Sequence, residues 1–492
     1  MSASQKYDIN SRYAESMVNG HGYPLPVLPR TPGDTLSIAE LGALGDGLTD
    51  NTVILQQAID RCSAEGGGCV LIPPGIWRTG PLRLRSHVRL HAAAGALVLF
   101  EPDPAVYPIL PSHYEGQPGP RCQAPLEAEG ATDIAITGEG IFDGNGQAWR
   151  PVKRAKLTAA AWEKLLASGG ALSPDGELWW PSEEGLHGER RLQELRGAGV
   201  EDCEAYEPVR AYLRPSLLRF RSCSRILLEG PTFQNSPAWC LHLQACDQVT
   251  IRHIQVRNPW YSQNGDGLDL DSCRHALVTH CAFDVGDDAI CLKSGKDEAG
   301  RLAGLPCEYI TIRDCTVYHG HGGFVIGSEM SGDVRAVRVS DCTFIGTDIG
   351  LRFKSARGRG GIIEDISIRR VRMSNIVYEG ISFHMFYAGT EGSAGSDDAP
   401  VAVDEGTPQC RNIAIHDVLI QDAETALLLN GLPEQPLKDI RIDGLTARAR
   451  QGIICRHATD VRLDRLALHG EAAGDIRLHR CTGVTGDGIP QG

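Results

Sequence analysis

A repeat of short strands constrains the fold of this chain more than any other feature. From about residue 217, related segments recur every 23 to 34 residues, among them "CSRILLEGPTF" at 223, "CDQVTIRHIQV" at 246, "CRHALVTHCAF" at 273, "CEYITIRDCTV" at 307 and "DVRAVRVSDCTF" at 333. Each contains two short runs of alternating apolar and polar residues, as half-buried strands do. A repeat of this period is typical of a solenoid whose coils bury their inward side chains against one another. We therefore predict an all-β fold, a single parallel β-helix.

One helix is expected before the repeat. The residues Val53, Leu55, Ala58 and Ile59 follow a near-helical spacing. Asp50 or Asn51 is a plausible helix cap, and the glycines of 66–68 would end the helix. We predict a short N-terminal helix cap on the solenoid. The expected organisation is an N-terminal extension over 1–34 and one β-helix domain over 35–492.

The period breaks between about 146 and 216. This stretch has helix-forming segments, many charges and the adjacent tryptophans Trp179 and Trp180. Long insertions into solenoids tend to lie on one face, which is often the binding face. We predict a partly helical insertion beside the binding site.

Composition excludes several classes of function. The formal net charge of -14 weighs against non-specific binding of nucleic acid or an anionic membrane. No apolar run approaches the roughly 20 residues that span a membrane. Because the first twenty residues are polar and lack the features of a secretory signal, we expect a cytoplasmic location. The 16 cysteines fall largely at repeat positions, where we expect reduced, buried thiols and no metal site.

Three repeats align without a gap from their inner cysteine, namely "CAFDVGD" at 281, "CTVYHGH" at 315 and "CTFIGTD" at 342. The alignment places Asp287, His321 and Asp348 at one position of successive coils. In the same register, Lys293 matches Lys354 two coils later. These side chains would stack, because paired strands lie about 4.8 Å apart.

A second carboxylate pair belongs to the same column. "DGLDL" from Asp266 aligns with "DAICL" from Asp288, so the two acids would stand one coil apart. In "GLRFKS", strand alternation directs the two apolar side chains inward and Arg352 and Lys354 outward. We predict one outer wall that carries Asp266, Asp287 with Asp288, His321, and Arg352 with Lys354.

Such a column suits glycoside hydrolysis. This reaction needs one protonated carboxyl group for the leaving oxygen and one ionised group to activate water or attack carbon. Clustered carboxylates raise the proton affinity of at least one member, so that an acid persists near neutral pH. Arg352 and Lys354 would bind an acidic group on the sugar.

At these residues the sequence resembles the polygalacturonase family, glycoside hydrolase family 28. Its four signatures occur in order as "NGD" at 264–266, "GDD" at 286–288, "GHG" at 320–322 and "RFK" at 352–354, and the likeness covers roughly 35–460. Together they are far more specific than any one alone. "GSEMSG" at 327–332 resembles the bacterial exo-acting branch. The resemblance implies a right-handed, single-stranded parallel β-helix that hydrolyses pectin backbones.

The resemblance also implies catalytic roles. Asp287 would be the general acid, while Asp266 and Asp288 would hold the attacking water, with inversion at the anomeric carbon. His321 would support the acid. For an inverting enzyme, the acid and base carboxyl groups are expected roughly 6.5 to 9.5 Å apart.

Substrate contacts follow from the same resemblance. Arg352 and Lys354 would grip a galacturonate carboxylate, and Tyr387 in "ISFHMFY" would contact sugar. Asn264 and Lys293 are further candidates for binding substrate. No cofactor is expected.

The predicted function is cleavage of α-1,4-galacturonosyl linkages in oligogalacturonides or pectin, with exo action. Alternatives within the fold are a rhamnogalacturonan hydrolase or another substituted-pectin hydrolase. A calcium-dependent pectate lyase is a further alternative, since clustered carboxylates also bind hard cations. A β-helix that binds polysaccharide without catalysis is the last.

Overall fold

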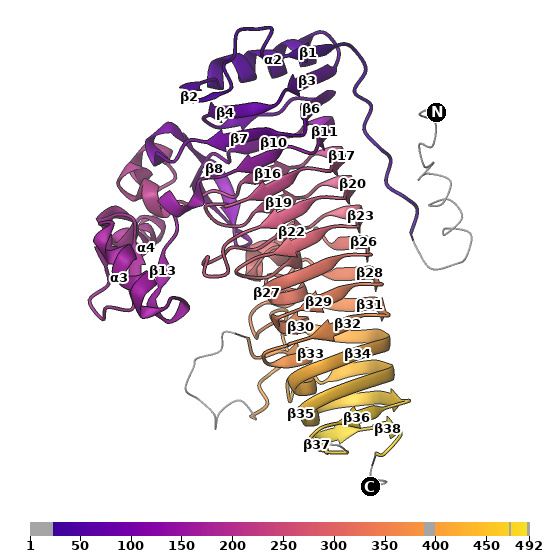
Figure 1. The fold of residues 1–492 in the computed structure, drawn as a ribbon. Coiled ribbons are helices and arrows are strands. Elements are labelled where there is room, and N and C mark those ends of the chain that lie inside the picture. The colour runs from indigo at the N-terminus through magenta and orange to yellow at the C-terminus, as the bar shows by residue number, and fades with distance from the viewer. Residues whose placement is uncertain (1–22, 388–398, 472–473, 490–492) are drawn as a thin grey trace.

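The computed structural model describes residues 23–387, 399–471 and 474–489, and these form a stack of coils that runs from α2 at one end to β37 and β38 at the other (Figure 1). A typical coil has three strands, such as β22 (Leu268–Asp271), β23 (Arg274–Thr279) and β24 (Ala282–Asp284). Each pairs in parallel with the equivalent strand of the next coil. The right-handed parallel β-helix is therefore confirmed.

The sequence repeat predicts two strands in each coil, whereas the structure has three. The additional strand forms the first face. That face comprises β5 (Leu82–Arg83), β10 (Leu126–Glu129), β16 (Leu218–Arg221), β19 (Leu241–Gln244), β22, β25 (Ile290–Lys293), β27 (Thr316–Ile326), β30 (Thr347–Lys354), β33 (Glu379–His384), β34 (Gln409–Asn430), β35 (Leu437–Asp464) and β37 (Ile476–Thr482). The last three coils are more continuous, so β34 and β35 each cross several faces.

The other two faces contain the strands that the repeat predicts. The second comprises β1 (Thr35–Ser37), β3 (Gly68–Ile72), β6 (Val88–Ala92), β11 (Thr132–Gly138), β17 (Ser224–Glu229), β20 (Asp247–Arg252), β23, β26 (Cys307–Arg313), β28 (Val334–Ser340), β31 (Ile362–Arg369) and β38 (Thr485–Gly486). The third comprises β2 (Asp46–Asp50), β4 (Gly75–Thr79), β7 (Ala96–Phe100), β12 (Ile141–Asp143), β18 (Thr232–Gln234), β21 (Gln255–Arg257), β24, β29 (Thr343–Ile345), β32 (Arg372–Ser374) and β36 (Ala467–His469).

The core is a set of ladders inside the coils. Phe353 stacks on Phe383 of the next coil with ring centroids 4.1 Å apart, and Phe324 contacts Phe353 edge to face. All 16 cysteines are free, and Cys281, Cys315 and Cys342 are buried, as predicted for reduced thiols in ladders.

The predicted helix cap is α2 (Thr52–Ala64), which lies at the first coils (Figure 1). Leu55, Ala58 and Ile59 are fully buried. Val53 is 65% exposed, so its assignment to the apolar stripe was wrong. It lies in the first turn of α2 and leaves the packing to the residues that follow.

The predicted partly helical insertion lies between β12 and β16. It contains β13 (Val152–Lys153), α3 (Ala159–Ala167), β14 (Ala171–Leu172), β15 (Leu178–Trp180), α4 (Glu183–Gly197) and a 3-10 segment over Cys203–Tyr212. Figure 1 shows α3, α4 and β13 beside the solenoid, on one flank.

A second excursion was not predicted. β8 (Ile109–Tyr114) and β9 (Gln117–Cys122) form an antiparallel hairpin between β7 and β10. Its tip lies against a distant coil, because a Cβ on Gly116 would come 2.6 Å from the backbone nitrogen of Lys296. Lys296 directly precedes α5 (Asp297–Ala303), the short helix after β25. The hairpin therefore spans the first face from β10 to β25.

Residues 1–22, which carry the expectation of a cytoplasmic location and most of the predicted extension, lie outside the described residues. Among the helices of the described part, none has the length and apolar character needed to cross a membrane.

Candidate active site

The register of the first face brings the predicted column together. Leu268 pairs with Ile290, so Asp266 lies beside Asp288. The amide of His321 donates to the backbone oxygen of Asp287 at 2.8 Å. The pairing continues through β27 and β30 to the strand end that carries Arg352 and Lys354. The stacking predicted from the aligned repeats is therefore what the strand pairing produces.

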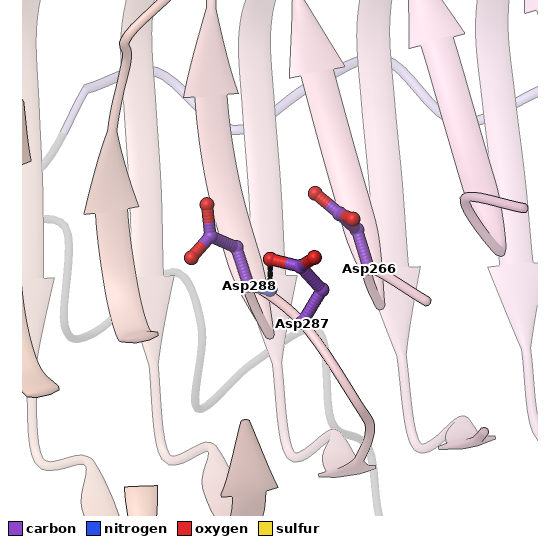
Figure 2. Close-up of side chains that lie close together, drawn as sticks. All are labelled: Asp266, Asp287 and Asp288. Atoms are coloured by element: carbon purple, nitrogen blue, oxygen red, sulfur yellow. Dashed lines mark hydrogen bonds between the residues drawn. The ribbon is translucent and has the colours of Figure 1, made fainter. Parts of the chain in front are cut away.

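Three carboxylates meet at the centre of this column. Figure 2 shows Asp266 and Asp288 at the starts of neighbouring strands with Asp287 between them, and one oxygen of each lies within 4.8 Å of the others. Asp266 and Asp288 are only 3% and 2% exposed, whereas Asp287 is half-buried. Asp287 Oδ1 accepts the backbone N–H of Asp288 at 3.0 Å. The nearest oxygens thus lie within 4.8 Å, and the separation of roughly 6.5 to 9.5 Å between the acid and base carboxyl groups stays a prediction.

Glycines make room for these groups. A Cβ on Gly322 would lie 2.3 Å from Val325 and 3.2 Å from Asp288 Oδ1. A Cβ on Gly286 would lie 2.5 Å from the Ser262 hydroxyl. Side chains at these positions would force the backbone apart, which explains why glycines flank His321 and precede the acid pair.

Asp288 is held ionised by cations. Lys354 Nζ lies 2.7 Å from Asp288 Oδ2, and Arg352 lies 3.7 Å from Asp288 Oδ1. Burial raises the pKa of Asp288, but Lys354, Arg352 and His321 outweigh burial and leave this pKa below its usual range. The same Asp288 carboxylate outweighs the effect of burial on Lys354 and leaves the pKa of Lys354 raised.

Asp266 has the opposite electrostatics. Burial and the neighbouring carboxylates of Asp269 and Asp287 raise its pKa well above the usual range. The Lys293 ammonium, 3.6 Å from Asp266, offsets only part of this effect. A cluster in which one acid is ionised and another favours its proton is the arrangement that acid–base catalysis requires.

Lys293 lies beneath the site. Its ammonium is 3.1 Å from Asp269 and 3.7 Å from Glu329, and the Lys293 side chain is only 6% exposed. It also lies 3.7 Å from the ring centroid of Trp239. Burial raises the pKa of Asp269 to about 7, although Lys293 acts in the opposite direction. Lys293 therefore lies among buried carboxylates, and its ammonium anchors Asp266.

His321 is half-buried beside the acids. Burial lowers the pKa of His321, and Arg352 lowers it further, whereas Asp288 and Asp287 act in the opposite direction. A neutral imidazole is therefore favoured near neutral pH. Its position one coil from Asp287 is the one that the aligned repeats predict.

Arg352 and Tyr387 form the wall next to Asp288. The Arg352 guanidinium lies 5.3 Å and the Lys354 ammonium 4.8 Å from the ring centroid of Tyr387. Arg352 Nη1 is buried and has no hydrogen-bond partner in the described part of the chain. A buried N–H donor without an acceptor costs free energy of folding unless a ligand supplies the acceptor.

Asn264 lies at the opposite end of the carboxylate cluster. Its Oδ1 accepts a hydrogen bond from Arg214 at 2.8 Å, and Arg214 also donates to the carbonyls of Pro237 and Gln263. Sequence reasoning missed Arg214, which belongs to no repeat. It also missed Asp269, although the alternation in "GLDLDSC" directs this side chain to the same face as Lys293.

The trio could also coordinate a hard cation, since its carboxylate oxygens converge. The ammonium and guanidinium on Asp288 already supply positive charge there. The donor set therefore fits acid–base chemistry at least as well as metal binding.

Comparison with known proteins gives the family. The family described as "Glycosyl hydrolases family 28" matches residues 197–449, just over half of the chain. The chain is 28% identical to a probable polygalacturonase from Vitis vinifera, over 83% of this chain and 73% of that protein. It is 25% identical to the exo-poly-alpha-D-galacturonosidase of Dickeya chrysanthemi, over 84% and 67% of the two chains.

A solved structure agrees with this match. The hyperthermoactive exopolygalacturonase from Thermotoga maritima superposes with a TM-score of 0.77 at 29% identity, covering 93% of this chain and 96% of that one. Together with the carboxylate trio and the cations beside it, the family match over more than half of its length shows that this chain belongs to glycosyl hydrolase family 28 and is a glycosidase.

Proposed function

We propose that the protein hydrolyses α-1,4-galacturonosyl linkages of oligogalacturonides, releasing terminal units. The observation that carries this proposal is the contact between the carboxylate cluster and the wall of Arg352, Lys354 and Tyr387. A glycosidase for neutral sugars has no need of buried cations beside its acids. A uronate carboxylate would supply a charge-assisted hydrogen bond to Nη1 of Arg352, which lies 3.7 Å from Asp288 Oδ1 and has no hydrogen-bond partner among the described residues. The names of the relatives support the same substrate class.

Burial divides the catalytic roles. Asp287 is the most exposed of the three acids and lies between the other two, so it delivers the proton to the leaving oxygen. Asp288, kept ionised by Lys354, is the base, and Asp266 orients the same water.

Two observations lead to opposite stereochemical expectations. Separations near 5 Å are typical of retaining enzymes, and the nearest oxygens here lie within 4.8 Å. Burial favours inversion, because Asp266 and Asp288 are recessed and a water molecule between them could reach the anomeric carbon more readily than either carboxylate. We propose inversion on this ground. Proton NMR of the first product formed from trigalacturonate decides, since the β-anomer indicates inversion and the α-anomer retention.

The hairpin supports exo action. It extends along the first face from β10 to the segment before α5, which follows the strand that begins after Asp288. A long polymer could not lie straight through a groove that is crossed in this way. Substrate would enter from the side of Arg352 and present one chain end.

Product analysis on oligogalacturonides of defined length tests the proposal. We expect monogalacturonate from the first turnover and a slow loss of viscosity with polygalacturonate. Rapid loss of viscosity at low extents of cleavage would contradict exo action. Activity only on rhamnose-containing oligosaccharides would favour the rhamnogalacturonan alternative, and unsaturated products would indicate a lyase.

A matched pair of variants tests the acid. Asp287→Asn should reduce kcat by about 10²- to 10⁴-fold, because proton transfer contributes a factor of this size. The control is Asp284→Asn, three residues earlier on β24, where the carboxylate pairs with exposed His319. Equal activity of both variants would exclude the acid role of Asp287.

A further inference from the structure

Arg121 of β9 is a cation without an ion pair to any acid of the described residues. Its guanidinium stacks 3.4 Å from the ring centroid of Tyr114. Across residues 23–387, 399–471 and 474–489, no carboxylate lies within 4.0 Å of it, and the guanidinium donates no hydrogen bond. Most arginines on this solenoid, such as Arg225 with Asp133, are paired with carboxylates instead. Arg121 therefore retains an unused fork of donors.

A chain of contacts connects Arg121 to the catalytic acids. The Tyr114 ring lies 4.7 Å from the ring of Trp239, which in turn contacts the Lys293 ammonium. Lys293 lies 3.6 Å from Asp266. Trp239 immediately precedes Cys240, whose amide donates to the backbone oxygen of Asp266. Arg121 thus flanks the end of the carboxylate cluster that is farthest from Arg352.

The charges around Tyr114 describe the same place. Burial raises the pKa of Tyr114, Glu115 and Asp266 raise it further, and Arg121 and Arg214 lower it. Burial lowers the pKa of Arg121, Tyr114 and the Glu115 carboxylate act in the opposite direction, and the nearby guanidiniums of Arg214 and Arg196 lower it further. Positive charges held together in a protein of net charge -14 attract an anion to this position.

A second unfilled group lies beside Arg121. The Tyr114 hydroxyl is buried and lacks a hydrogen-bond partner among the described residues. Arg214 donates to two carbonyls and to Asn264, with no ion pair to a carboxylate in the part that the structure describes. A planar fork, an open hydroxyl and a second positive charge match the recognition of a carboxylate.

We propose that Arg121 binds the carboxylate of the terminal uronate at the hairpin end of the cleft, on the side of the acids opposite to Arg352 and Lys354. The inference rests on the proposed function and deepens it. The two cationic positions would read the sugars on the two sides of the scissile bond. The enzyme would thus require acidic sugars on both sides.

Substrate analogues test this assignment. The probes are digalacturonate and two analogues in which galactose replaces either the reducing or the non-reducing unit. Arg121→Gln should lower kcat/KM for digalacturonate by about 10- to 100-fold, the effect of a lost charge-assisted pair. The kcat/KM of Arg121→Lys should lie between the values of the unmodified protein and of Arg121→Gln, because lysine keeps the charge without the planar fork of donors. The matched control is Arg89→Gln, an exposed arginine on β6.

One analogue should respond differently. For the analogue whose hairpin-side unit lacks the carboxylate, Arg121→Gln and the unmodified protein should have equal kcat/KM. The same fold-loss on both analogues, or no loss on digalacturonate, would overturn the proposal. Circular dichroism and Tm, compared with those of Arg121→Lys, show whether the variant is folded.

A binding assay separates this proposal from the proposed function. Isothermal titration with galacturonate and galactose needs no turnover. Galacturonate should lose one of its two binding sites in Arg121→Gln and keep the site at Arg352 and Lys354, and an equal number of galacturonate sites in both proteins overturns the assignment. Absence of galacturonide hydrolysis by the unmodified protein would instead refute the function.

Discussion

Replacing Lys293 with methionine tests whether this residue contacts substrate or anchors the acids. The Lys293 ammonium lies within 3.1 to 3.7 Å of Asp269, Asp266 and Glu329, and the side chain is 6% exposed. Methionine keeps most of the volume and removes the charge. The variant would leave three buried carboxylates without their shared cation.

The magnitude follows from the burial of this network. Removing one partner of a buried ion pair costs about 3–5 kcal/mol, because the remaining charge is uncompensated. With an unfolding entropy proportional to chain length, this corresponds to about 3–5 °C in Tm if the solenoid unfolds as one unit. The double variant Lys293→Met with Asp269→Asn should recover part of the loss.

The pH dependence gives a sharper signature. Lys293 lowers the pKa of both Asp266 and Asp269, so its removal lets both rise further above their unfolded values. Acids with a raised folded pKa stabilise the fold at low pH, and this contribution is lost as pH rises through the folded pKa. The deficit in Tm should therefore be larger at pH 8 than at pH 5. The pH optimum of kcat should move upward.

Thermal melts at both pH values and a pH–rate profile on trigalacturonate provide the assay. The control is Lys438→Met on β35, an exposed lysine whose loss should change stability by less than about 0.5 kcal/mol. An unchanged Tm and pH profile together with a raised KM would refute the anchoring role and restore the substrate contact predicted from sequence.

Three further predictions address the remaining parts of the structure. Lys354→Gln should raise the pKa of Asp288 toward the usual range. The acid limb of the pH–rate profile, which reports loss of the ionised base, should therefore move to higher pH. An unchanged acid limb would exclude Lys354 as the cation that sets the pKa of Asp288. Phe353→Ala should destabilise by about 3–5 kcal/mol in urea unfolding, because the ring is fully buried against Phe383, and a loss below about 1 kcal/mol would contradict close packing of this ladder. A chelator should leave the rate unchanged, and the products should not absorb in the ultraviolet. A calcium-dependent lyase would instead lose activity with the chelator and release products that absorb in the ultraviolet.

The column of site residues could be predicted because strand pairing is local and repetitive. Once one strand of a coil aligns with the next, the two-residue alternation of side chains sets the following pairs, apart from local shifts such as the one at Asp284 in the pairing of β24 with β27. The match of Lys293 to Lys354 across two coils followed from this rule, although α5 lies between the strands. Extra residues leave the coil between strands and do not shift the register.

Burial could not be predicted from the same pattern. Alternation directs Lys293 away from the core, which favours an exposed side chain and a contact with substrate. Lys293 is nevertheless covered, since Trp239 and the carboxylates of neighbouring coils enclose this ammonium. Exposure there depends on residues 54 positions apart in the chain, which no local rule connects.

The hairpin was missed for a related reason. β8 and β9 contain three prolines and no clear alternation, and their partners are each other and not the coils. Their place over the first face is fixed by the contact of Gly116 with the Lys296 backbone and by the stacking of Tyr114 on Trp239. Both contacts join segments far apart in the sequence.

These two origins separate the acid–base chemistry from the proposed exo action. Asp266 and Asp288 directly precede paired strands and Arg352 lies on one, so a change in the hairpin leaves their spacing intact. The hairpin belongs to no coil, and it alone brings Arg121 to the far end of the acids. Replacing residues 112–119 by a short Gly-Ser turn should therefore preserve cleavage while the first products lengthen from single units to mixed oligomers. If the shortened enzyme still releases only single units, closure of the cleft must come from the insertion with α3 and α4 instead.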